Sequence, residues 1–165
     1  MKMRWVSIAA ALLLAGCASF DGRGLVPGQS TAKDVEALMG TPAERITVSG
    51  GDTIWYFPRQ PTGRETWAVR LTPAGVMRSK EQLLTEENLK NITAGATTAK
   101  QAREILGPPW RISHNGRTQR EIWEYNMFNA TLWDYFLYVQ LSGDGIVREV
   151  LLLKDYIKEV GAAKD

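Results

Sequence analysis

Histidine and cysteine are almost absent from this chain, which has one of each among its 165 residues, His114 and Cys17. Nucleophilic triads and zinc sites draw on these side chains, so both are disfavoured. His114 stands before an Asn-Gly pair, a pattern typical of a surface turn. The sequence contains no phosphate-binding loop motif. We therefore expect a non-enzymatic protein that needs no cofactor and no metal.

The N-terminus lacks an apolar run long enough to cross a membrane. The run from Trp5 to Leu14 has about ten residues, whereas a bilayer-spanning helix needs about 20. It follows Lys2 and Arg4 and ends in small residues, which is the pattern of a secretory signal peptide. We therefore expect residues 1–16 to be a signal peptide that is removed on export.

The segment Leu14–Cys17, with the sequence Leu-Ala-Gly-Cys, resembles the lipobox of bacterial lipoproteins. The resemblance implies that Cys17 becomes the first mature residue and carries diacylglycerol and an amide-linked acyl chain. In such proteins an Asp just after the cysteine marks inner-membrane retention, whereas this chain has Ala18 and Ser19. The expected location is the outer membrane, facing the periplasm. Residues 17–29, which contain several chain breakers, are expected to form a lipidated tether. The alternative is an ordinary exported protein with a coincidental cysteine.

Excess charge of either sign is also missing. Without Lys2 and Arg4, the basic residues equal the 18 acidic ones in number. A nucleic-acid-binding domain needs a basic face, and electrostatic anchoring to a membrane needs a polybasic patch. Nucleic acid is therefore not an expected partner, and membrane attachment is expected to come from the lipid on Cys17.

One pattern occurs twice in the sequence. Residues 28–42 match residues 95–109 at a constant offset of 67, with small or apolar residues at helical spacing in both copies. Each copy has a Thr followed three residues later by Asp or Gln, as in a capping box, and then a glycine with a proline two residues beyond it. Further matching blocks follow in the same order, around Trp55 and Trp123 among others. The sequence therefore predicts a tandem duplication.

The predicted fold class is α+β, with two tandem two-layer units. Each unit is a helix, or a helix pair, followed by an antiparallel sheet of three to four strands. Alternating hydrophobicity assigns side chains such as Val69 and Val139 to the core, together with the tryptophans Trp55, Trp67 and Trp123. A helix from Leu83 to Ile92 is expected to lead the second copy and has no equivalent in the first. The expected boundaries are 30–80 for the first unit, 81–153 for the second unit and 154–165 for a C-terminal tail.

These patterns resemble a known family of small exported proteins. The capped helix with its Gly-x-Pro exit, the Trp-containing strand and the following strand that runs into a glycine turn are similar to the SmpA/OmlA family. Its members are outer-membrane lipoproteins that include a small component of the β-barrel assembly machinery. The segment Leu84–Ile92 ahead of Gly95-Ala-Thr-Thr is similar to that family's two-helix start. The duplicated layout also resembles the β-lactamase inhibitor proteins. Because this chain has two units where the usual family member has one, no family contact is assigned to individual residues.

Aromatic residues make up only 9% of the chain, but several of them gather in the stretch from Tyr125 to Tyr138. If Leu137 faces the core, its neighbours in the strand face the other way. Exposed aromatic side chains are enriched at protein interfaces. The alternatives are that the two units pack against each other there, or that the C-terminal segment covers these residues. The predicted partner-binding residues are Phe128, Trp133, Phe136 and Tyr138.

Together, these patterns predict an outer-membrane lipoprotein that binds other envelope proteins. The SmpA/OmlA resemblance implies an accessory role in outer-membrane β-barrel protein assembly, with barrel-assembly proteins as partners. Two alternatives stay open at this point. One is a protein inhibitor of a periplasmic or exported enzyme, which the inhibitor-like duplication implies. The other is a structural lipoprotein that binds lipid or cell wall.

Overall fold

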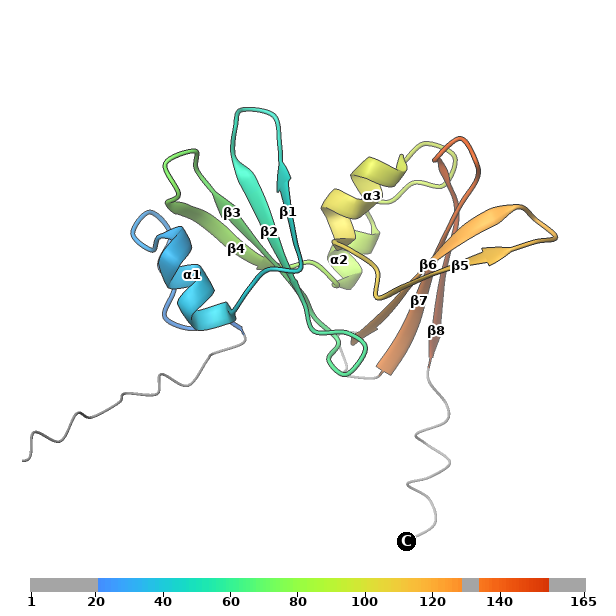
Figure 1. Cartoon of the computed structure of the whole chain (residues 1–165). Helices are drawn as coiled ribbons and strands as arrows, with labels where there is room; N and C mark the ends of the chain where they lie inside the picture. The colour runs from blue at the N-terminus through green and yellow to red at the C-terminus, as the bar shows by residue number, and fades with distance from the viewer. Residues whose placement is uncertain (1–20, 129–133, 155–165) are drawn as a thin grey trace, which may run out of the picture.

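The computed structural model describes residues 21–128 and 134–154, which form two α+β units in tandem (Figure 1). Each unit contains a four-stranded antiparallel sheet in which neighbouring strands are consecutive in the sequence. The first unit consists of α1 (Ala32–Met39), β1 (Glu44–Thr47), β2 (Thr53–Pro58), β3 (Thr66–Leu71) and β4 (Met77–Gln82). The second consists of α2 (Glu86–Leu89), α3 (Ala99–Leu106), β5 (Arg111–Asn115), β6 (Arg120–Phe128), β7 (Asp134–Leu141) and β8 (Val147–Lys154). The predicted α+β class with two tandem units is confirmed.

The two longer helices begin and end as the repeated pattern predicts. Thr31 and Thr98 cap the N-termini of α1 and α3, each in a complete capping box. Gly40 and Gly107 follow the last turns with φ of 82° and 75°. Their ψ values of −165° and −171° place them outside the left-handed helical region in which many helix-terminating glycines lie. They adopt an extended conformation with positive φ, which is essentially restricted to glycine.

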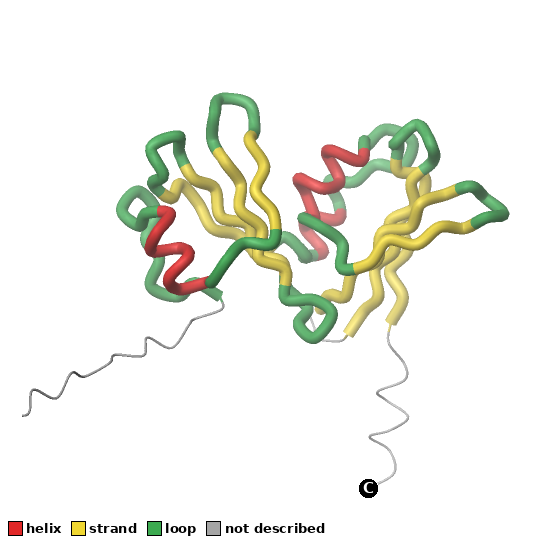
Figure 2. Tube along the Cα trace, in the orientation of Figure 1, coloured by secondary structure: helices red, strands yellow, loops and turns green. Residues whose placement is uncertain are grey.

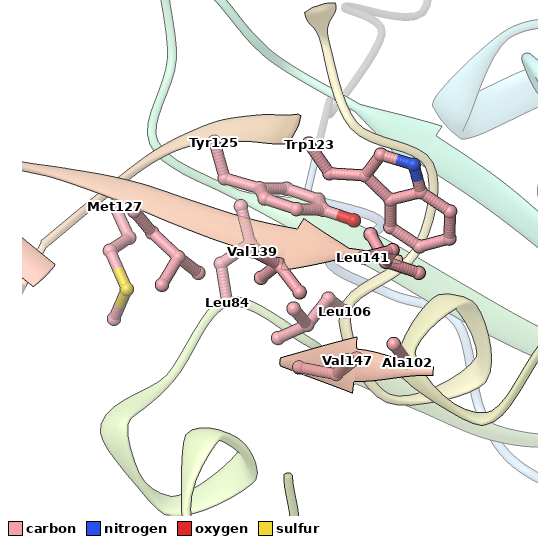
Figure 3. Packing of buried hydrophobic residues seen from close by; sticks show 10 residues of the cluster. Leu84, Ala102, Leu106, Trp123, Tyr125, Met127, Val139, Leu141 and Val147 are labelled. Carbon is pink, nitrogen blue, oxygen red and sulfur yellow. The ribbon is translucent and has the colours of Figure 1, made fainter. Parts of the chain in front are cut away.

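The core of the second unit lies between its sheet and its helices (Figure 3). Trp123, Tyr125 and Met127 extend from β6 and pack with Leu106 of α3 and Leu84, which precedes α2. The Tyr125 hydroxyl donates a 3.0 Å hydrogen bond to the Gly107 carbonyl, so the end of α3 is fixed to the sheet. Burial raises the pKa of Tyr125 well above its ordinary value, which keeps this donor protonated. The prediction that Trp123 belongs to the core is confirmed, since it is 5% exposed.

The sheet of the first unit is buried on both faces. On the α1 side, Val35 and Met39 pack on Val69 and Leu71, with Trp55 and Trp67 partly buried beside them. On the other face, Ile54, Tyr56 and Ala68 form a separate apolar cluster with Leu83, and all four are buried. Figure 1 shows α2 and α3 lying between the two sheets. The second unit therefore covers the face of the first sheet that α1 leaves open.

Several polar contacts join α3 to the first unit. Arg103 of α3 forms a bidentate ion pair with Glu44 of β1, with its Nε donating to one carboxylate oxygen at 3.1 Å and its Nη2 to the other. The hydrogen bond to Glu44 is the main cause that raises the pKa of Arg103. Burial, followed by the nearby Glu104 carboxylate, raises the pKa of Tyr56 to about 12. The two units are thus joined by an apolar contact with a charged pair beside it.

The described part of the segment predicted to be a tether, residues 21–29, is held against the first unit at several points. Lys80 Nζ donates to the carbonyl oxygens of Asp21 and Gly22, at 2.6 and 3.1 Å. Leu25 packs against the α1 cluster, and the Gly28 amide donates to the Met77 carbonyl at 2.7 Å. Residues 21–29 therefore belong to the folded unit. Their backbone forms no helix or strand, but hydrogen bonds to Met77 and Lys80 attach it to β4. For residues 21–29 this differs from the predicted tether of residues 17–29, whose first four residues lie outside the described residues.

Two predicted elements differ in length from those in the structure. The helix expected from Leu83 to Ile92 is the four-residue α2, which is capped by Thr85 and preceded by Leu83 and Leu84. Strand β4 runs through polar residues to Gln82, two residues beyond the predicted end of the first unit at residue 80, because these residues pair with β3. Within the described residues, no helix is long and apolar enough to cross a membrane. The predicted signal peptide, Cys17, Trp133 and all but Lys154 of the predicted tail lie outside the described residues.

Candidate protein-binding face

The candidate site is the side of the second sheet that is turned away from α2 and α3, called here the outer face. Strand register defines its members, because directly opposed residues of antiparallel strands share a face. Tyr138 of β7 is opposite Glu124 of β6 and Leu151 of β8, and Phe136 is opposite Asn126 and Leu153. The intervening residues Leu137 and Val139 are fully buried against the helices. Phe136 and Tyr138 therefore point away from the core, as predicted.

One end of the outer face is apolar. Phe128 is 41% exposed and Leu153 is 51% exposed, and these are among the few large apolar side chains of the described residues that are exposed. Phe136, Tyr138 and Leu151 lie beside them and are partly buried. Phe128 ends β6, at the margin of the outer face, where it also lines a depression with Thr85 and Lys90 at the two ends of α2. Phe136 is near the start of β7 and Leu153 is near the end of β8. These five residues, called here the apolar end, occupy neighbouring positions on three adjacent strands.

The other end of the outer face is polar and internally paired. Arg120 Nη1 lies 3.0 Å from a carboxylate oxygen of Glu149 and also donates to the Gln140 side chain at 3.2 Å. Ser113 donates a 2.8 Å hydrogen bond to Glu124 across β5 and β6. These polar side chains form hydrogen bonds with one another. Burial of the apolar end by a partner would therefore give a larger favourable free energy than burial of the polar end.

A loop of the first unit borders the apolar end. Arg64, in the loop between β2 and β3, forms an ion pair with Asp134 at 2.6 Å, and the two side chains are only 12% and 14% exposed. The side-chain oxygen of Gln60, in the same loop, accepts a 2.5 Å hydrogen bond from the backbone N–H of Asn126, and the Pro61 carbonyl accepts one from the Asn126 side-chain amide. The loop therefore fixes the edge of β6 and the start of β7, which hold Phe128 and Phe136.

The duplication shows what is particular to the outer face. Tyr138 occupies the position of Ala68 in the first unit, at the offset of 70 that relates the two third strands. Ala68 is 4% exposed in the contact with the second unit, because a small side chain there allows the close approach of that unit. In the last strands, Leu151 replaces Glu81 at the same offset. The equivalent surface thus carries larger apolar side chains where it is not covered by the other unit.

The structure brings together three of the four predicted binding residues. Phe128, Phe136 and Tyr138 lie on the outer face, and Trp133 falls in the part of the chain that is not described. Sequence reasoning missed Leu151 and Leu153. The signal was available in the repeat, since residues 150–153 are Val-Leu-Leu-Leu, whereas the equivalent residues 80–83 are Lys-Glu-Gln-Leu.

A shallow depression in the second unit contains the single histidine of the chain. His114 and Glu121 line a shallow depression beside the β7–β8 turn, with His114 Nε2 3.6 Å from the Glu121 carboxylate. The side chain of His114 is 72% exposed, as expected for a surface residue, but His114 belongs to strand β5 and precedes the predicted turn. Among the described residues, no three His, Cys, Asp or Glu side chains are grouped in a way that could hold a metal ion.

Comparisons with known proteins leave the SmpA/OmlA resemblance as a prediction. No family model and no curated protein matches the sequence. A solved structure of a DUF4309 family protein, YjgB from Bacillus subtilis, is 19% identical in sequence. It covers 84% of this chain and 91% of its own, with a TM-score of 0.31. A likeness of this strength supports no conclusion about the site.

Proposed function

We propose that this chain is an outer-membrane lipoprotein that binds other envelope proteins through its outer face. It is anchored by acylated Cys17 and faces the periplasm, and it serves as an accessory factor in outer-membrane β-barrel protein assembly. The observation that carries the binding role is the apolar end, where exposed Phe128 and Leu153 adjoin Phe136 and Tyr138. Aromatic side chains surrounded by a polar rim are typical of protein interfaces.

The binding role is tested by capture from detergent-solubilised envelopes with the lipidated protein as bait. Phe128→Ala and Leu153→Ala should each reduce recovery of the captured proteins about tenfold, since truncation of an interface anchor costs about 1.4 kcal/mol or more. Ile112→Ala is the matched control, because Ile112 is 48% exposed on β5 but lies opposite Trp123 and not on the outer face. Equal recovery with all three variants would place the interface elsewhere.

The assembly role is tested by the identity of the captured proteins. Barrel-assembly components should be recovered repeatedly with the parent protein and with Ile112→Ala. If none of them is ever recovered, the assembly role is wrong, even where other envelope proteins bind. Anchoring is tested separately with Cys17→Ala, which should leave the folded protein out of the membrane fraction.

The two tandem units favour a second candidate function, inhibition of a periplasmic or exported enzyme, because the layout resembles that of known protein inhibitors. The same outer face would then cover the enzyme. Activity assays of candidate hydrolases with the soluble domain distinguish the two functions. Loss of enzyme activity that Phe128→Ala relieves would favour the inhibitor.

A further inference from the structure

The point at which the folded part begins limits how far the protein can stand from a membrane. Lys80 holds the carbonyls of Asp21 and Gly22, and an added Cβ at Gly22 would lie 2.8 Å from the Met39 and Leu25 side chains, so the backbone there is closely packed. A chain from Cys17 to Asp21 reaches at most about 14 Å, whereas a free tether from Cys17 to Gln29 would reach at most about 43 Å. Only the shorter reach is compatible with the structure.

The entry point lies at the same end of the molecule as the apolar end of the outer face. Figures 1 and 2 show that the described part of the chain begins near the C-terminal end of α1, at the end of the molecule where the β2–β3 loop lies and where β8 ends. The β1–β2, β3–β4 and β7–β8 turns lie at the opposite end. The Arg64–Asp134 ion pair and the pairing of Tyr135 with Lys154 join the β2–β3 loop, the start of β7 and the end of β8.

We infer that this end of the lipidated protein contacts the bilayer, so that the headgroup layer lies against the region around Asp21 and the β2–β3 loop. The inference rests on the proposed acylation of Cys17. It places Phe128, Phe136 and Leu153 beside the membrane and the paired polar residues of the outer face farther from it. A partner of the apolar end must then be reachable at the membrane surface, as the exposed rim of a membrane-embedded protein is.

Depth-dependent quenching tests this orientation. Cys17 is the only cysteine, and acylation blocks its sulfur, so a single introduced cysteine can carry a fluorophore. Thr62→Cys labels the β2–β3 loop and Ser49→Cys labels the β1–β2 turn, and both positions lie in loops at the surface. Strand β2 between them has six residues, which separates the labels by roughly 20 Å along the strand. In phosphatidylethanolamine and phosphatidylglycerol vesicles with a headgroup nitroxide, quenching at position 62 should exceed that at position 49 severalfold.

A longer tether supplies the control. A 20-residue Gly/Ser insert between Phe20 and Asp21 has a root-mean-square span of about 25 Å, so it should remove the difference between the two labels. Equal quenching without the insert, or stronger quenching at position 49, overturns the orientation while leaving the anchor intact. If the parent protein reacts with the thiol label and does not sediment with vesicles, Cys17 is not acylated, and the proposed anchoring is wrong together with the orientation.

Discussion

Gly107 and Gly40 offer a direct measurement of how closely the two units pack. Both follow a helix of the same design and both have positive φ with extended ψ. An added Cβ at Gly40 meets no atom within 4 Å. At Gly107 it would lie 2.6 Å from Thr66 Cγ2, 3.3 Å from Leu83 and 3.4 Å from Tyr56, all residues of the surface that the second unit covers. Alanine substitution at Gly40 therefore measures the cost of backbone strain alone, and substitution at Gly107 measures that strain together with the contact between the units.

The expected destabilisation follows from these distances. Gly40→Ala should lower the free energy of unfolding by about 1–3 kcal/mol, the cost of holding a non-glycine residue in this backbone region. Gly107→Ala has the same strain and adds a steric clash. Thr66 is fully buried and branched at Cβ, so its methyl group cannot move aside freely. Overpacking of this kind adds a further cost of about 1–3 kcal/mol.

Thermal and urea unfolding of the soluble domain, followed by circular dichroism, measures both variants. About 1 kcal/mol corresponds to about 2–4 °C in Tm for a domain of this size, so Gly107→Ala should melt several degrees below Gly40→Ala. The effect of glycine on the unfolded chain is the same in both and cancels in the comparison. Equal losses for the two variants would show that α3 does not approach the first sheet as closely as the structure has it.

Two further predictions concern the contact between the units. The Tyr56 hydroxyl is buried without a hydrogen-bond partner in the described part of the chain, so Tyr56→Phe should be neutral or stabilising by about 1 kcal/mol in urea unfolding at pH 7. Its raised pKa, about 12 against 10 in the unfolded chain, means that the unfolded state loses the proton first. Between pH 10 and 12 the unfolded chain ionises while buried Tyr56 stays protonated, so the free energy of unfolding falls as pH rises over that interval, and the Phe variant should lose less of it. A double-mutant cycle on Arg64 and Asp134 should give a coupling energy above that of the exposed Glu87–Lys90 pair, expected at about 0.5 kcal/mol or less. Equal coupling energies would mean that burial of the first pair does not strengthen it.

Local patterns account for the part of the fold that the sequence predicts. Thr31 and Thr98 cap helices because each can accept a hydrogen bond from the amide three residues on, a contact that depends on no distant residue. The hairpin strands and the buried Val69 and Val139 follow from alternation along single strands. These features are predictable because the residues that determine them are neighbours in the sequence.

Contacts between distant residues account for what the sequence did not predict. Tyr56 looks like an exposed member of an alternating strand, and only the docking of α3 shows that it is buried. The segment from Asp21 has no helix or strand period, yet Lys80 and the edge of β4 fix it by contacts between residues far apart in the sequence. The absence of periodicity predicts a loop but does not predict whether that loop is free or packed.

The duplication also bears on whether copies of the protein can polymerise head to tail. Helix α3 of the second unit covers the sheet of the first, and α1 is the equivalent of α3, so the outer face could in principle receive α1 of another copy. Such a head-to-tail contact does not close and would form filaments. The outer face differs where this contact would form, because Tyr138 replaces Ala68 and Glu124 replaces Tyr56. A bulky side chain and a charge there oppose the close approach of a second α1.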